Sequence, residues 1–219
     1  MLKELIHEQV QEARAGQAPR KYLGASSIGN QCERAIWYGY RNYPREDASK
    51  LLITFEIGKS LEAMLIEMIA MTPITLMTPM QNNNFLSFAH ESVPELSGHL
   101  DGLLLINGEH YVLEIKTANA ASYAKAAKVG IRAWRPEYYD QMQTYMGLST
   151  YTKAICLVIN KDSSDLYEEI VHFDQMHYEL LVSKAARIVK SDVEPERLSS
   201  SPMFFICKMC SYHKVCHGC

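Results

Sequence analysis

The sequence predicts an α/β protein in which helices flank a small mixed β-sheet. Three observations support this class. Apolar residues recur at helical spacing in several segments, short apolar runs alternate with these segments, and one Asn-Gly pair separates two such runs. The 219 residues, 47% of them hydrophobic, are enough for one globular domain with a sizeable core.

The expected elements follow one another without a convincing linker, repeat or low-complexity tract. Helices are expected at residues 1–16, about 30–41, about 54–71, 136–148, where Pro136 begins the helix, and about 176–190. A turn followed by a strand is expected over 82–93, a hairpin over 99–116, and two further strands at about 153–160 and 166–173. We expect one domain, composed of an N-terminal helical segment (1–50), a core (51–195) and a cysteine-rich tail (196–219).

Charge and hydropathy exclude several classes of protein. The net charge of −3 gives no global basic field, so any nucleic-acid binding must come from local patches. No apolar run approaches the roughly 18 residues of a membrane span, and the N-terminal segment reads as a charged amphipathic helix rather than a signal peptide. We therefore expect a cytoplasmic protein, where disulfides are rare and cysteines serve as thiols or metal ligands.

The strongest local signal is the stretch HLDGLLLINGEHYVLEIK, residues 99–116. Asn107-Gly108 between two apolar runs predicts a two-residue type I′ turn, which fixes the register of both strands. Asp101 is then expected opposite Glu114, and His99 opposite Lys116. Because side chains alternate between faces, we expect two distinct faces. The first carries His99, Asp101, Leu103, Leu105, His110, Val112, Glu114 and Lys116, and the second, expected core face carries Leu100, Leu104, Ile106, Tyr111, Leu113 and Ile115.

Two opposed carboxylates on one face repel each other. Their Cβ atoms are expected about 4.5–5.5 Å apart, where like charges are destabilising. A bound divalent cation would offset this repulsion, and hard oxygen ligands suit Mg²⁺ or Mn²⁺. The alternative is a solvated polar end of the hairpin with Lys116 as counter-ion. His99 shares this face, but a lone histidine is more often structural than a neighbour of a metal.

Three motifs in order, GHLDG, LEIK and QMQTY, resemble the PD-(D/E)XK nuclease superfamily. More narrowly, they are similar to its RecB-like branch, to which CRISPR-associated exonucleases with an iron–sulfur cluster belong. The resemblance implies a restriction-endonuclease-like core and a metal-dependent DNA nuclease. It also implies an exonuclease more readily than an endonuclease, acting on single-stranded or free ends, in a bacterial, archaeal or phage-encoded recombination, repair or CRISPR-type setting.

The resemblance also assigns roles to residues. It implies that Asp101 and Glu114 bind Mg²⁺ or Mn²⁺, that the carbonyl of Ile115 completes the site, and that Lys116 is the catalytic lysine. Gln141 and Tyr145 match the branch's Q-x3-Y motif, and because residues i and i+4 share a helix face both can point at one spot. The alternative for this pair is a polar, solvated helix face.

An upstream helix departs from the family pattern. The branch has G-x3-H, whereas this chain has Gly58 followed by Glu62. Glutamate is a harder ligand than imidazole, so Glu62 remains a candidate metal ligand. The substitution leaves open the metal preference and the number of ions, and a solvated helix position is the alternative.

The cysteines are concentrated at the C-terminus. In the same branch a subset holds a 4Fe-4S cluster through one cysteine before the core and three after it, spaced C-x2-C-x5-C. Cys32, Cys207, Cys210 and Cys216 match that pattern, and joining them closes a loop of about 175 residues. The competing site is a zinc knot formed by Cys207, Cys210, Cys216 and Cys219. Cys156, inside an apolar run, is expected to be a buried small hydrophobe.

A basic, aromatic segment precedes the Q-x3-Y helix and is the candidate DNA contact. Its predicted DNA-binding residues are Lys125, Lys128, Arg132, Trp134 and Arg135. Lysine and arginine bind phosphates, and aromatic rings stack on unpaired bases. The alternative is an ordinary charged, solvated helix.

Two other functions compete with a nuclease. One is a catalytically silent iron–sulfur or zinc DNA-binding adaptor in a recombination, repair or adaptation complex. The other is a zinc-stabilised interaction protein with no nucleic-acid role. An intact Asp101, Glu114 and Lys116 favours the enzyme, because a silent scaffold has no need of a repulsive acid pair.

Overall fold

The computed structural model describes residues 1–18, 20–79 and 86–218. The turn expected at 82–84 and the competing zinc ligand Cys219 therefore lie outside the described residues. The helices are α1 (Leu2–Ala15), α2 (Ala25–Ile28), α3 (Glu33–Tyr40), α4 (Ser49–Ala70), α5 (Ala120–Val129), α6 (Ile131–Trp134), α7 (Pro136–Ser149), α8 (Gln175–Lys190), α9 (Phe205–Lys208) and α10 (His213–His217). The strands are β1 (Leu23–Gly24), β2 (Thr75–Met77), β3 (Ser87–Ala89), β4 (Leu96–His99), β5 (Gly102–Ile106), β6 (Glu109–Ala118), β7 (Lys153–Asn160) and β8 (Leu166–His172).

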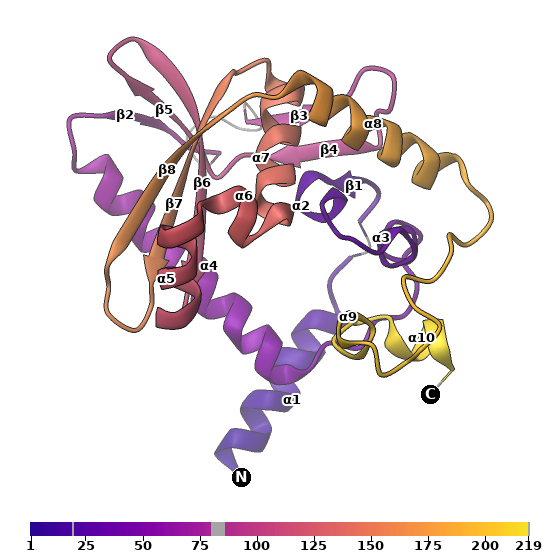
Figure 1. Ribbon diagram of the computed structural model, residues 1–219. Helices are drawn as coiled ribbons and strands as arrows, with labels where there is room; N and C mark the ends of the chain where they lie inside the picture. Colours follow the sequence, from indigo (N-terminus) through magenta and orange to yellow (C-terminus); the bar gives the residue numbers. More distant parts are fainter. Residues whose placement is uncertain (19, 80–85, 219) are drawn as a thin grey trace.

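The larger of the two sheets has five strands in the order β2-β5-β6-β7-β8 (Figure 1). All its pairings are antiparallel except β6 with β7, which are parallel. Parallel neighbours need a crossover connection, and α5, α6 and α7 supply it. The expected α/β architecture with a mixed sheet flanked by helices is confirmed.

Helices cover both faces of this sheet. On one face, Leu103 and Val112 pack with Met142 and Met146 of α7. On the other, a second cluster joins the sheet to α4, and its buried members are Leu65, Leu104, Leu113, Ile115, Ile155 and Ile159. The face expected in the core is indeed buried, through Leu104, Leu113 and Ile115. The first face contributes to the core as well, through Leu103 and Val112. On the α7 face, Glu114 and Lys116 lie at the end of the hairpin that is remote from the Asn107-Gly108 turn.

The chain changes sheets between β4 and β5, which corrects the expected hairpin. β4 belongs to a three-stranded sheet with β1 and β3, so His99 pairs with Ser87 instead of lying opposite Lys116. Leu100 donates its backbone N–H to Leu86, 3.1 Å away, and packs in the core on the α7 side. The first strand of the expected hairpin is therefore divided into β4 and β5. β4 pairs with β3, whereas β5 pairs with β2.

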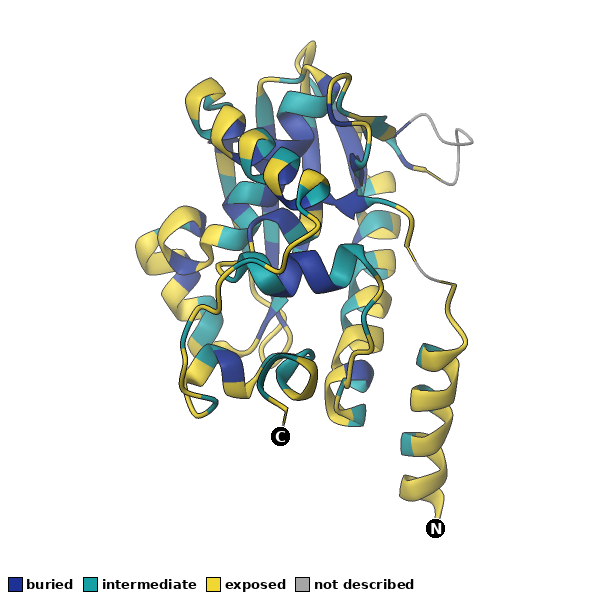
Figure 2. Ribbon diagram, turned by 90° about the vertical axis from the view of Figure 1, so that its right-hand side faces the viewer, coloured by how far each residue is buried: buried dark blue, intermediate teal, exposed yellow. Residues whose placement is uncertain are grey.

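Most expected helices and strands are present, with shifted boundaries. Pro136 begins α7 as predicted. α3 starts later than expected, directly after Cys32, whereas α4 starts earlier, at Ser49. β2 was missed because three residues are too few to show a periodic pattern. α1 is almost wholly exposed (Figure 2), although an ion pair of 3.3 Å joins Arg14 to Asp47 just before α4.

The N-terminal and C-terminal segments lie side by side, with α9 and α10 next to α3 (Figure 1). The rings of Tyr38 on α3 and Tyr212 before α10 have centroids 5.7 Å apart. α8 holds the loop before α3, because Lys184 Nζ donates hydrogen bonds of 2.7 Å to the carbonyls of Ile28 and Asn30. Within the described ranges, no helix combines the length and apolar character that a bilayer crossing requires.

Candidate active site

The β5–β6 hairpin brings two acidic residues to one end of the larger sheet. Asn107 and Gly108 both have positive φ, as a type I′ turn requires, and the strands pair in the predicted register from Ile106–Glu109 to Gly102–Leu113. Asp101 lies one residue beyond the last of these pairs, in a bend. Its Oδ2 accepts a hydrogen bond of 3.0 Å from the backbone N–H of Ile115, next to Glu114. The two acids are thus neighbours, as predicted.

Glu114 is fully buried, and its two carboxylate oxygens differ in their contacts. Its Oε1 forms an ion pair with Lys116. Within the described part of the chain, its Oε2 has no hydrogen-bond partner. Burial, and then the negative charge of Asp101, raise the pKa of Glu114 to about 8. A buried carboxylate oxygen without a partner is costly, which makes this position a candidate site for a cation or a hydrogen-bond donor.

Lys116 connects the hairpin to α7. Burial alone would lower the pKa of its amine, but the charges of Glu114 and Asp101 outweigh burial and raise it. The amine also donates a hydrogen bond of 3.3 Å to Gln141 Oε1. Gln141 Nε2 in turn donates to the hydroxyl of Tyr145, 2.9 Å away. Gln141 and Tyr145 therefore share one buried helix face, and that face points to the lysine.

Glu62 approaches the same end of the sheet from α4, the helix on the opposite face. Its carboxyl is half-buried, and burial followed by the charge of Asp101 raises its pKa to about 7. Burial also raises the pKa of Asp101, against the opposing effects of Lys116 and the Ile115 amide. Three carboxyl groups thus interact electrostatically around one lysine.

The acids are not arranged as a finished metal site. Nowhere in the described ranges do three His, Cys, Asp or Glu side chains form a group able to hold a metal ion as they stand. In this structure Lys116 pairs with one oxygen of Glu114, and the Ile115 amide donates to Asp101. The donor set nevertheless fits a hard cation such as Mg²⁺, since it consists of carboxylate oxygens. Ile115 contributes its N–H here, and a role for its carbonyl remains a prediction.

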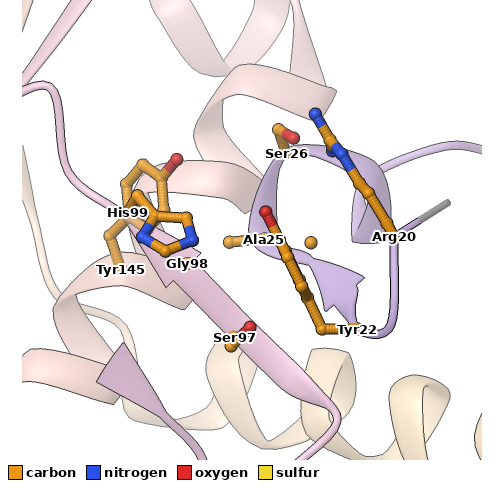
Figure 3. A pocket seen from close by; sticks show the side chains of 9 residues that line it. Arg20, Tyr22, Ala25, Ser26, Ser97, Gly98, His99 and Tyr145 are labelled. Carbon is orange, nitrogen blue, oxygen red and sulfur yellow. The ribbon is translucent and has the colours of Figure 1, made fainter. Parts of the chain in front are cut away.

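A polar pocket of about 180 Å³ adjoins this centre and shares Tyr145 with it (Figure 3). The side chains of Arg20, Tyr22 and Ser26 line it from the N-terminal segment, and His99 lines it from β4. The rings of Tyr22 and His99 meet edge to face, with centroids 5.7 Å apart. Sequence patterns could not predict this pocket, because its two walls are separated by about 75 residues of chain and meet only after folding.

The residues predicted to contact DNA differ in their exposure to solvent. Lys125, Lys128, Arg132 and Arg135 are exposed on α5, on α6 and just after α6. Trp134 is only 6% exposed, and its indole Nε1 donates a hydrogen bond of 3.0 Å to Ser122 Oγ. The ring of Trp134 packs in the core, which argues against the predicted base-stacking role. The four basic residues remain candidates.

The four cysteines expected to form a cluster come together between α3 and the C-terminal helices. All four are free thiols. The pKa of Cys207 is raised first by burial and then by Cys32 and Cys216. The pKa of Cys210 is raised first by burial, and Cys32, Cys216 and Cys207 add to this. The thiols are therefore close enough to influence one another, without forming a ready-made metal group. Cys156 is completely buried, as predicted.

Comparisons with known proteins connect this fold to solved structures. No family model matches the chain, and no curated protein matches it. The crystal structure of SSO0001 is similar with a TM-score of 0.63 and 16% identity, over 100% of this chain and 97% of that chain. The alkaline exonuclease LHK-Exo from Laribacter hongkongensis is similar with a TM-score of 0.57 and 16% identity, over 78% of this chain and 87% of that chain.

This chain shares its fold with an exonuclease. LHK-Exo in complex with dAMP gives a TM-score of 0.55 at 17% identity, over 77% of this chain and 86% of that chain. At sequence identities this low, the likeness shows a shared fold alone. The chemistry of the site has to be argued from its own residues. The nuclease-like core implied by the motif resemblance is supported by this likeness, whereas the RecB-like branch and the iron–sulfur cluster remain predictions.

Proposed function

We propose that this chain is a metal-dependent deoxyribonuclease that hydrolyses phosphodiester bonds in DNA. The observation that carries the proposal is the buried Glu114, whose Oε2 lacks a partner among the described residues while Asp101, Glu62 and Lys116 surround it. A structural acid pair would be expected to satisfy both oxygens or to remain exposed. An unsatisfied, repulsive acid cluster beside a lysine suits a cation that arrives with the substrate.

Each residue has a role in this reaction. Asp101, Glu114 and Glu62 would hold Mg²⁺ or Mn²⁺, with the Ile115 carbonyl as a further ligand. An ion held there would neutralise charge at the phosphate and would lower the pKa of a water molecule. Lys116 places a positive charge where the attacking oxygen or the transition state needs it. Gln141 orients Lys116, and Tyr145 fixes the amide of Gln141.

The pocket beside Tyr145 favours a substrate with a free end. It offers the guanidinium of Arg20, the hydroxyls of Ser26 and Ser97, and the rings of Tyr22 and His99 (Figure 3). A guanidinium group and hydroxyl groups can bind a phosphate, and aromatic rings can stack on a base. A cavity of about 180 Å³ is of a size to take part of one nucleotide, which would suit the end of a strand. The four exposed basic residues of α5 and α6 would contact the remainder of the strand.

We also propose that Cys32, Cys207, Cys210 and Cys216 hold a structural 4Fe-4S cluster. The thiol-only donor set and the mutual proximity of the four residues support it. The role of the cluster would be to fasten α3 to the C-terminal helices. Anaerobically purified protein should be brown and should contain iron, and Cys32→Ser should lose both. A colourless protein that contains zinc would select the zinc knot instead.

The nuclease is tested with DNA strands labelled at either end, supplied in linear and circular form with Mg²⁺ or Mn²⁺. We expect degradation of linear strands from an end, little action on circles, and loss of activity in Asp101→Ala. Wild-type protein that binds these strands but leaves them intact with either ion would identify a silent DNA-binding adaptor. Cleavage of circles would exclude a strict exonuclease and retain the hydrolytic centre.

A further inference from the structure

Tyr138 presents its ring to the lysine of the candidate centre. The amine Nζ of Lys116 lies 4.7 Å from the centroid of the Tyr138 ring. Tyr138 is half-buried in the first turn of α7, three residues before Gln141 and seven before Tyr145. This spacing places all three residues on one helix face. A cation within about 6 Å of an aromatic centroid is attracted by the electron-rich face of the ring.

Trp134 packs against the Tyr138 ring. The two rings meet edge to face, with centroids 5.5 Å apart and an interplanar angle of 71°. Trp134 is itself fixed by burial and by its hydrogen bond to Ser122. The residue that the sequence suggested for base stacking therefore has a different use. It holds a second aromatic ring against the lysine.

The ring of Tyr138 adds an aromatic contact to the polar contacts of Lys116. The amine touches Glu114 Oε1, Gln141 Oε1 and the ring of Tyr138. Lysine has a flexible four-carbon stem, so its charged end stays in place only where contacts hold it. If Glu114 shared its charge with a bound cation, its attraction for the lysine would weaken. Gln141 and Tyr138 would then carry more of the positioning.

We propose that Tyr138 is a positioning residue whose ring face holds the Lys116 ammonium beside Glu114. The inference rests on the proposed function, because it gives Lys116 a catalytic task. Its essential element is the electron-rich face, and the hydroxyl of Tyr138 is dispensable. A residue that only filled space would act equally well with an electron-poor ring.

The kinetic test varies the electrons of the ring at nearly constant size. Tyr138→Phe should keep kcat within about twofold, whereas Tyr138→Leu should lower it about tenfold with little change in KM for the DNA strand. Phenylalanine carrying one, two or three ring fluorines at position 138 should lower kcat step by step. Tyr151→Leu is the control, because Tyr151 is a half-buried ring on the same core beyond the far end of α7. Equal activity across the fluorinated series would overturn the proposal.

A second test needs no DNA cleavage. In the metal-free protein, the ring current of Tyr138 should shift the εCH₂ protons of Lys116 upfield in the NMR spectrum. The shift should persist in Tyr138→Phe, vanish in Tyr138→Leu, and disappear with its signal in Lys116→Ala. Ordinary lysine shifts in the wild-type protein would refute the contact. If the shift is present but DNA is never cleaved, the proposed function fails and the contact stands.

Discussion

Asp101 accepts a hydrogen bond of 3.0 Å from the backbone N–H of Ile115, although the chain is bent at Asp101 and outside any strand. This bond extends the register of the hairpin by one step beyond its last paired residues. It keeps the carboxyl of Asp101 beside Glu114, although the preceding strand, β4, belongs to the three-stranded sheet. This backbone contact therefore helps to hold the acid pair together at the point where the two sheets separate.

Neutralising Glu114 should abolish catalysis without unfolding the protein. Glu114→Gln keeps the shape of the side chain but removes the charge that a cation requires, so we expect single-turnover cleavage to fall at least about 100-fold. Binding of a labelled strand should change little. Glu109→Gln is the matched control, because Glu109 is an exposed acid of the same strand, paired with Lys153 at 2.6 Å. Retained cleavage in Glu114→Gln would remove this residue from the mechanism.

Glu62 should make the metal-free protein sensitive to alkali. Its pKa is raised to about 7 in the folded state, first by burial and then by Asp101. A raised carboxyl pKa gives stability that is present at low pH and lost as the pH rises through the folded value. Replacing Glu62 by Gln removes that loss. The Tm of Glu62→Gln minus that of wild type should therefore become more positive between about pH 5 and about pH 8.5.

The same variant should respond differently to metal. Added Mg²⁺ should raise the Tm of wild-type protein at alkaline pH, because binding to the folded state stabilises it. The increase should be smaller in Glu62→Gln. Glu67→Gln, at an exposed site on the same helix, should resemble wild type throughout. A Tm difference between Glu62→Gln and wild type that does not vary with pH would show that Glu62 is an ordinary solvated acid.

Gly98 should tolerate no side chain, because it packs against Tyr145. A Cβ at this position would lie 2.5 Å from the Tyr145 ring and 3.0 Å from Ala25. We expect Gly98→Ala to lower the free energy of unfolding by about 1–3 kcal/mol, since overpacking strains a close-packed core. Urea denaturation measures this change. Gly16→Ala, where the nearest atom is 3.5 Å away at an exposed helix end, should have little effect.

Local signals in the sequence predicted the centre of the candidate site. The Asn107-Gly108 turn sets the register within a few residues, so it placed Asp101 beside Glu114. The i, i+4 spacing likewise placed Gln141 and Tyr145 on one face. Both predictions depend only on geometry between near neighbours in the chain.

Features that depend on distant partners were not predictable in this way. The break before β5 arises because β2 and β3 pair with different halves of the chain around Asp101. The sequence suggests a base-stacking role for Trp134, but in the fold its ring is enclosed by the core and donates a hydrogen bond to Ser122. The pocket needs Arg20 and His99 together, and no periodic pattern connects those positions.

Arg20 should contribute more to binding the end of the DNA strand than to the chemical step. It lines the pocket beside Tyr145, and its guanidinium stacks over Tyr22, 5.9 Å from the ring centroid. Because a phosphate contact contributes binding energy without taking part in bond cleavage, Arg20→Ala should raise KM for linear strands about tenfold while kcat changes little. Lys3→Ala, which removes an exposed charge on α1, should leave both constants unchanged. Steady-state cleavage at several salt concentrations measures the effect, and the KM of Arg20→Ala should depend less steeply on salt. An unchanged KM in Arg20→Ala would mean that the strand end binds elsewhere.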